Sequence, residues 1–234
     1  MSAEAEPALG GPRVVEPAQP AGAGPRLPAA GDGYFFPQTA TGVPLAVFSF
    51  GFTVGMLGLF DTNIVTGLAS GMFVATAFGV GGIGLLIGGL WEFRANNAFG
   101  GTFGVVYGLF VLTTALMLKV FAPAVTAAAG TAGFGHAFGA WMILWGIFTV
   151  VMAAGARTVN LPAFVAFGLL TAVYFVLGIA AIGGAAGLAA SLTKVGGWLA
   201  LADGVAAWYL GAGILLNGML GRPVIPLFPH QQAG

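Results

Sequence analysis

The chain has 234 residues, of which 58% are hydrophobic and 6% are charged, and its seven basic residues balance its seven acidic residues. Water-soluble globular domains carry roughly 25% charged residues, and the mean hydropathy here is +0.97. This composition excludes an ordinary soluble domain and offers no basic patch for nucleic acid. Because the sequence has no cysteine, it also excludes disulfides, iron–sulfur clusters and thiolate metal sites.

Residues 1–33 differ in composition from everything that follows. They hold six of the thirteen prolines and six of the fourteen charged residues, and they contain no aromatic residue. Such a segment buries too little apolar surface to offset the entropy of folding. We therefore predict a disordered cytoplasmic tail at 1–33 and a membrane domain at 34–228.

The membrane domain is a series of apolar, glycine-rich stretches with most of its charges in the gaps between them. A stretch of about 20 apolar residues is long enough to cross a bilayer as a helix. The pattern predicts an all-α, polytopic membrane protein with a bundle of six transmembrane helices. The predicted spans are 44–60, 69–91, 100–121, 136–156, 161–182 and 195–220.

Prolines support several of these boundaries. Pro44 and Pro162 fall in the first turns of their spans, where a missing N–H costs nothing. Pro123 is expected to follow the end of the third span. No proline is predicted in a helix interior.

Lys and Arg are divided unevenly between the two sides of the predicted bundle. Arg94, Arg157 and Arg222 fall on the side that carries both termini, whereas the other side has Lys119 and Lys194. By the positive-inside rule we place both termini in the cytoplasm, in a multi-pass protein of the inner (plasma) membrane.

Glycines recur at four-residue spacing within the spans, as in the run Gly100, Gly104 and Gly108. Small residues at this spacing let helix backbones approach closely. We interpret most of them as packing positions rather than as contacts to a substrate.

Polar side chains inside the spans are few, and each needs a partner or a function. Thr53 and Tyr107 are candidates to line a passage, because a hydroxyl can replace water around a solute. Asp203 lies about 12 Å into the last span, at hydrocarbon depth. It is either the proton acceptor of a transport cycle or a structural hydrogen-bond partner, and the sequence favours neither.

Acidic residues at the helix ends receive a simpler interpretation. Asp61 and Glu92 are predicted to be solvated caps or headgroup charges. No serine stands at a suggestive spacing from a histidine or lysine, and there is no histidine pair for a haem. We expect no enzyme activity, no cofactor and no metal site.

Short segments throughout the apolar region share a pattern with one membrane protein family. Residues 41–47 read TGVPLAV, residues 89–93 read GLWEF and residues 144–149 read LWGIFT. Together with 97–100, 107–110 and 196–226, they resemble the acetate uptake transporter family, whose signature is Asn-Pro-Ala-Pro-Leu-Gly-Leu. The family includes bacterial acetate/succinate permeases and fungal acetate and ammonia transport proteins.

The resemblance implies both an architecture and a function. It implies a six-helix protomer, a hexamer in the lipid bilayer, and a pore through each protomer for acetate and other small monocarboxylates. Family members are described as proton-coupled symporters or as anion channels. The resemblance also implies a hydrophobic constriction formed by Phe50, Tyr107 and Leu169.

The start of the first span is a candidate substrate site. Thr41, Gly42 and Ala46 stand where the signature has Asn, its first Pro and Gly, so the substrate range stays open and includes succinate. The first turn, with Thr41, Pro44 and Leu45, exposes backbone N–H groups at the positive end of the helix dipole, which suits a carboxylate. The hydroxyls of Thr53 and Tyr107 are then expected to replace water along the path.

Uptake of an anion against an inside-negative potential costs about 2.3 kcal/mol per charge per 100 mV, so it needs a proton or a steep gradient. We therefore predict proton-coupled acetate uptake, with Asp203 as the candidate proton relay. Three alternatives stay open: an anion channel, a substrate-binding membrane subunit of a multi-component importer, and a purely structural membrane protein.

Overall fold

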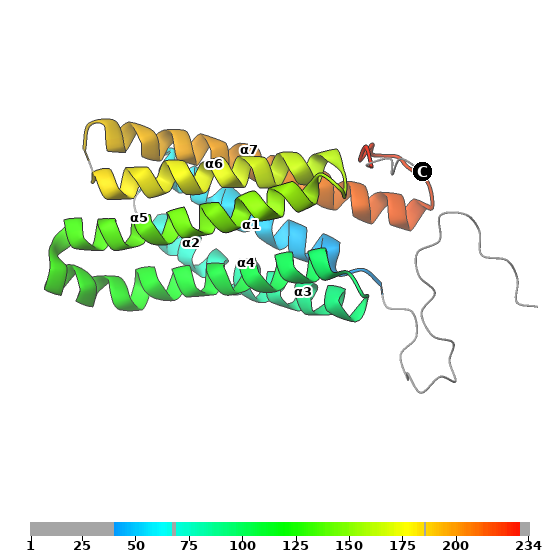
Figure 1. Cartoon of the computed structure of the whole chain (residues 1–234), viewed down its shortest axis with the longest axis horizontal. Helices are drawn as coiled ribbons and strands as arrows, with labels where there is room; N and C mark the ends of the chain where they lie inside the picture. The colour runs from blue at the N-terminus through cyan, green and yellow to red at the C-terminus, as the bar shows by residue number, and fades with distance from the viewer. Residues whose placement is uncertain (1–39, 67–68, 185, 230–234) are drawn as a thin grey trace, which may run out of the picture. The chain divides into compact units, whose positions relative to one another are not determined.

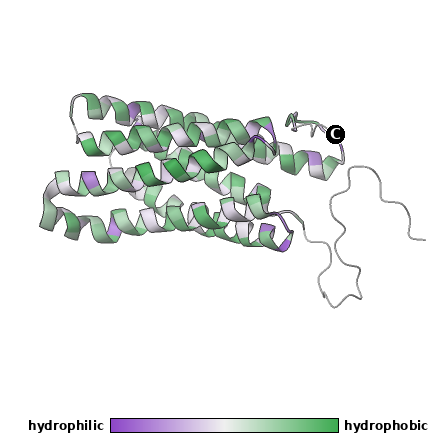
Figure 2. Ribbon diagram, in the orientation of Figure 1, coloured by the Kyte–Doolittle hydropathy of each residue, from purple (hydrophilic) through white to green (hydrophobic). Residues whose placement is uncertain are grey.

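The structure is a computed structural model that describes residues 40–66, 69–184 and 186–229. The predicted tail at 1–33 and the first residues of the predicted domain lie outside this part. The described residues are mostly helical, and five stretches are long and apolar enough to cross a membrane. Figure 2 shows hydrophobic residues along most of the helical length, which suits a surface covered by lipid.

The helices follow one another with short connections (Figure 1). They are α1 (Val43–Asp61), α2 (Ala69–Thr76), the π-helix η1 (Ala77–Ile83), α3 (Gly84–Arg94), α4 (Ala98–Leu116), the π-helix η2 (Met117–Phe121), α5 (Ala122–Ala156), α6 (Leu161–Gly183) and α7 (Leu188–Leu220). Local chemistry sets two of the starts, because the side chains of Asn97 and Asn160 cap α4 and α6.

The longest apolar stretch runs from Ala98 to Ala156. A straight helix of this length would be about 90 Å long, about three times the thickness of the hydrocarbon core of a bilayer. Gly130 interrupts it with φ 72° and ψ 171°, a conformation that glycine adopts without a Cβ clash. Figure 1 shows the ribbon turning back within α5, so that the later part of α5 runs back beside α4.

Three boundary predictions were wrong, two in this region and one at the last span. Residues 122–135, expected as a connection, are helical on both sides of Gly130, because this segment is rich in alanine. Pro123 lies in the first turn of α5 directly after η2, rather than beyond a helix end. The last helix begins at Leu188 instead of 195.

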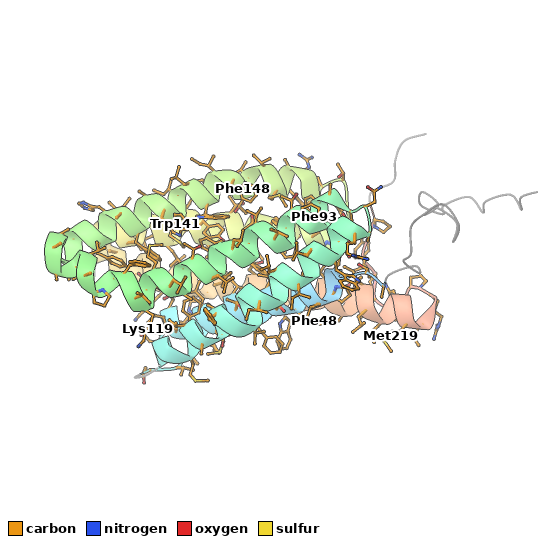
Figure 3. The ribbon with its side chains drawn as sticks, turned by 90° about the horizontal axis from the view of Figure 1, so that it is seen from below. Phe48, Phe93, Lys119, Trp141, Phe148 and Met219 are labelled. Carbon is orange, nitrogen blue, oxygen red and sulfur yellow. The ribbon has the colours of Figure 1, made fainter. Side chains whose placement is uncertain are left out.

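The helices contact one another in a closed order. Helix α1 packs against α3 and α7, α7 against α6, α6 against α5, and α3 against α4. Helices α4 and α5 meet through long side chains, with the rings of Phe110 and Trp145 4.6 Å apart. Figure 3 labels Trp141 and Phe148 on α5 and shows Lys119 and Met219 toward opposite ends of the helices. An aromatic core therefore lies inside the ring of helices.

The contact between α3 and α4 depends on glycine. A Cβ built on Gly89 would lie 2.7 Å from the Cα of Gly104, and a Cβ on Gly108 would lie 2.9 Å from the backbone nitrogen of Leu86. Both distances are shorter than carbon side chains allow, so the backbones approach each other only because these positions lack side chains. The interpretation of Gly104 and Gly108 as packing positions is confirmed.

Candidate functional site

Two cavities lie within the described part of the chain, at opposite ends of the helices. The large cavity, about 510 Å³, extends to Phe60 at the end of α1, to Lys119 on η2 and to Thr193 near the start of α7. The small cavity, about 140 Å³, lies where α1, α4 and α6 begin, and Val43 and Asn97 line it.

One barrier separates the cavities. Phe50 of α1 and Leu170 of α6 line both cavities, and both side chains are buried. Phe103 packs edge-on against Phe50 at 6.0 Å between ring centroids and against Phe167 at 5.5 Å. Tyr107 packs against the same cluster and lines the large cavity. The path between the cavities is therefore closed by apolar side chains.

The structure places two of the three predicted constriction residues at this barrier and corrects the third. Phe50 and Tyr107 lie there, but Leu169 is only half-buried and lines neither cavity. Leu170 occupies the position instead. Successive residues on an α-helix differ by about 100° in direction, so an error of one residue turns the side chain away from the core.

The hydroxyls predicted to line the path are already bonded inside the protein. Thr149 donates its hydroxyl proton to the carbonyl oxygen of Trp145 at 2.7 Å. The 2.8 Å bond between Tyr107 and Thr149 must then be donated by Tyr107. Thr53 donates to the carbonyl oxygen of Ser49 at 2.9 Å. In this arrangement neither predicted hydroxyl has a proton for a carboxylate.

Glu92 links the starts of two helices. It is 2% exposed, and its Oε1 accepts hydrogen bonds from the Thr41 hydroxyl at 2.7 Å and the Gly42 N–H at 2.6 Å. Its Oε2 accepts from the side-chain amide of Asn97 at 2.5 Å. The interpretation of Glu92 as a solvated charge was wrong, because these three donors compensate its burial.

The remaining residues predicted at the first turn of α1 lie outside both cavities. Pro44 and Leu45 line neither of them, and Leu45 is exposed. Thr41 is bonded to Glu92, so a protein carboxylate already occupies the position expected for a substrate. From this end of α1, Val43 and Val47 reach the small cavity instead.

Helix dipoles nevertheless make the small cavity suitable for an anion. Asn97 accepts a hydrogen bond from the Gly100 N–H at 3.0 Å, and Asn160 accepts one from the Ala163 N–H at 2.9 Å. With Val43, these residues bring the starts of α1, α4 and α6 to one cavity. Each helix start carries a partial positive charge. An asparagine just before an apolar run is the sequence signal for these caps.

Asp203 lies in the interior of α7 and is 0% exposed. Neither carboxyl oxygen has a hydrogen-bond partner in the part of the chain that the structure describes. Asp203 lines neither cavity. The structural hydrogen bond considered for Asp203 is therefore not seen among the described residues.

Comparison with known proteins identifies the family. A family model described as GPR1/FUN34/yaaH matches residues 31–227. The chain belongs to this family. The resemblance seen in the sequence is confirmed, and the GPR1/FUN34/yaaH match together with the five apolar helical stretches identifies a multi-pass membrane protein.

Several relatives of the chain are named as transport proteins. The succinate-acetate/proton symporter SatP of Escherichia coli strain K12 is 34% identical over 191 residues, which cover 81% of this chain and 96% of SatP. Acetate permease A of Emericella nidulans is 28% identical over 204 residues, covering 83% of this chain and 68% of the permease. A solved structure of the bacterial acetate channel SatP matches with a TM-score of 0.70 and 30% identity, covering 81% of this chain and 99% of that one.

Proposed function

We propose that the chain moves acetate and similar small monocarboxylates, with succinate as a further substrate, through a pore within each protomer. The observation that carries this proposal is the pair of cavities that extend from opposite ends of the helices to a shared barrier at Phe50 and Leu170. A single closed segment inside one protomer is what a gated path for a small solute requires.

The chemistry of the barrier supports proton-coupled uptake. The barrier presents aromatic and aliphatic side chains, and the hydroxyls of Tyr107 and Thr53 are already donating within the protein. An ionised carboxylate would cross it without hydrogen bonds, which is costly. Passage together with a proton removes that cost and makes uptake electroneutral. Asp203, a buried carboxyl group without a hydrogen-bond partner among the described residues, is our candidate for the proton relay.

The proposal also covers the number of membrane spans and the orientation of the chain in the membrane. Gly130 divides the longest apolar stretch, so we assign six spans, with both termini in the cytoplasm and the protein in the inner (plasma) membrane. Arg94 is the last residue of α3, and Arg157 and Arg222 follow α5 and α7, all at the end of the bundle that holds the small cavity, which supports a cytoplasmic position for that end. Assembly as a hexamer rests on family resemblance.

Two other functions compete with a proton symporter. An anion channel is supported by the name of the solved relative, a bacterial acetate channel. A substrate-binding membrane subunit of an importer would bind a carboxylate but move nothing without its partners.

Uptake of labelled acetate into liposomes that contain the purified chain separates these functions. The measurement compares wild type with Asp203→Asn, with and without an inward proton gradient, and uses Asp61→Asn to test the carboxyl group that lines the large cavity at the end of α1. We expect the gradient to stimulate uptake in wild type and Asp61→Asn but not in Asp203→Asn. Uptake indifferent to both the gradient and Asp203→Asn would establish the channel instead. Binding of acetate without any uptake would establish the importer subunit.

A further inference from the structure

The segment that follows α7 turns back along the helix that it has just left. Gly221 ends α7 with φ 63°, a left-handed conformation that glycine adopts readily, and Figure 1 shows the chain reversing beyond it. Residues 222–229, which we call the latch, then run beside the helices. The proposed path makes no use of this segment.

Two polar side chains of α7 hold the first half of the latch. The Asn217 side chain accepts hydrogen bonds from the backbone N–H groups of Val224 and Ile225 at 2.8 and 2.9 Å, and it donates one to the carbonyl oxygen of Ile225 at 2.8 Å. About two turns earlier on α7, the Tyr209 hydroxyl donates to the carbonyl oxygen of Pro226 at 2.7 Å. All four lengths are typical of good hydrogen bonds, so the latch is firmly anchored on α7.

Leu227 adds an apolar anchor on the same helix. Its side chain is half-buried, packs against the hydrophobic core and lies where Gly213 of α7 has no side chain. A Cβ built on Gly213 would lie 2.5 Å from the Cδ2 of Leu227, which is closer than carbon atoms can pack. A larger residue at position 213 would therefore displace Leu227.

The far end of the latch reaches the start of α6. The Leu161 N–H donates to the carbonyl oxygen of Phe228 at 3.3 Å, and Asn160 pairs with Pro229 in an isolated antiparallel bridge. Both contacts are made by backbone atoms, and the 3.3 Å bond is longer than an ordinary N–H···O bond. Phe228 also has φ 46°, which is unfavourable for a bulky residue. The described contacts therefore hold the latch less firmly at α6 than at α7.

The latch connects two walls of the small cavity. On the α6 side, Val159 and Asn160 line this cavity, and Asn160 is the residue that pairs with the latch. On the α7 side, Ile214 lines the cavity and lies between the anchors Tyr209 and Asn217 in the sequence. A change in the latch is thus passed directly to residues of the path.

We propose that the latch is a gate for the small cavity. While its end is bound to α6, the α6 and α7 walls are held together and access to the cavity is narrow. When its end leaves α6, the start of that helix moves away from α7 and the cavity opens. Asn217 and Tyr209 are positioning residues that act on the cavity through the latch. This inference rests on the proposed function, because it assigns a gate to the same path, but it concerns access and not flux.

Cysteine accessibility tests the gate, because the sequence has no cysteine of its own. Ala163→Cys places a thiol in the wall of the small cavity, and Thr193→Cys places one in the wall of the large cavity, at the other end of the helices. The purified full chain in detergent is treated with 2-sulfonatoethyl methanethiosulfonate, a small anionic thiol reagent. The rate of modification is measured by mass spectrometry.

Variants that loosen the latch should speed modification of Ala163→Cys alone. Tyr209→Phe removes one hydrogen bond and should raise the rate about fivefold, whereas Asn217→Ala removes three and should raise it by about tenfold or more. Gly213→Ala should also raise the rate, because its methyl group displaces Leu227. The rate at Thr193→Cys should not change in any of them.

Gly218→Ala is the matched control for Gly213→Ala. Both glycines lie on α7, but a Cβ built on Gly218 would meet nothing within 4 Å. Ala163→Cys should therefore be modified in Gly218→Ala at the rate seen without it. Equal acceleration by Gly213→Ala and Gly218→Ala would place the cause in α7 itself and would overturn the gate.

Two further outcomes would overturn the gate. Faster modification of both cysteines would show a general loosening of the bundle, and an unchanged rate at Ala163→Cys in Asn217→Ala and Tyr209→Phe would show that the latch is only a packed terminus. Because labelling does not need transport, the two proposals fail separately. Unchanged labelling with acetate uptake intact overturns the gate alone. The expected labelling without any uptake in liposomes overturns the proposed function and leaves the gate established.

Discussion

The two cavities share a barrier but use their polar groups in opposite ways. At the small cavity, Asn97 and Asn160 hold the starts of their own helices, and Glu92 accepts three hydrogen bonds from the segments beside it. At the large cavity, the hydroxyls of Tyr174 and Thr114 have no partner among the described residues.

The polar groups at the two ends of the path are therefore expected to differ in their contribution to stability. Polar groups at the small cavity set the positions of helix starts, so their loss should reduce stability. The hydroxyls of Tyr174 and Thr114, which have no partner in the part of the chain that the structure describes, add nothing to stability, so their loss should leave the free energy of unfolding unchanged. Natural proteins place such locally unfavourable groups mainly at functional sites.

The largest expected effect comes from removing the carboxylate beside the small cavity. Glu92→Ala leaves the Gly42 N–H and the Asn97 amide without their acceptor and should lower the free energy of unfolding by about 3 kcal/mol. The loss is measured by denaturation of the detergent-solubilised protein.

Asp61→Ala is the matched control at the other end of α1. Asp61 has no hydrogen-bond partner among the described residues, so its removal should cost less than about 1 kcal/mol. An equal loss of unfolding free energy in Glu92→Ala and Asp61→Ala would show that Glu92 does not stabilise the end of the bundle beside the small cavity.

A smaller effect is expected at the barrier that both cavities share. Leu170→Ala removes a side chain that lines both cavities and should cost about 2 kcal/mol of stability, at the low end for a buried leucine because cavities already flank it. It should also increase uptake of butyrate relative to acetate, because the barrier widens. Leu169→Ala, one residue earlier, should leave the butyrate-to-acetate ratio unchanged. The opposite result would place Leu169 in the barrier.

The sequence was sufficient for the parts of the fold that depend on composition and periodicity. Apolar length predicted the helical stretches, and glycine spacing predicted the close contact of α3 with α4. The sequence did not predict the break at Gly130. An alanine-rich helix and an alanine-rich connection have similar compositions, and only the backbone conformation of Gly130 interrupts the helix here.

The candidate site was predicted less completely, because its chemistry depends on which partner each polar group finds. Glu92 at a helix end has the sequence appearance of a solvated charge, and only the folded chain brings Gly42, fifty residues earlier, to its carboxylate. Tyr107 and Tyr174 are alike in sequence as tyrosines within apolar spans. Thr149, a hydroxyl on another helix, distinguishes them by bonding to one and not the other.

The smallest expected effect is at Tyr107, and it contrasts with Tyr174 in the same cavity. Because the Tyr107 hydroxyl donates to Thr149, Tyr107→Phe should cost about 1 kcal/mol of stability and leave the KM for acetate unchanged. A double-mutant cycle with Thr149→Val should assign most of that loss to the pair. Tyr174→Phe should instead leave stability unchanged, because the Tyr174 hydroxyl has no hydrogen-bond partner among the described residues. A weaker KM for acetate in Tyr107→Phe, with no coupling to Thr149, would mean that this hydroxyl turns into the pore during transport.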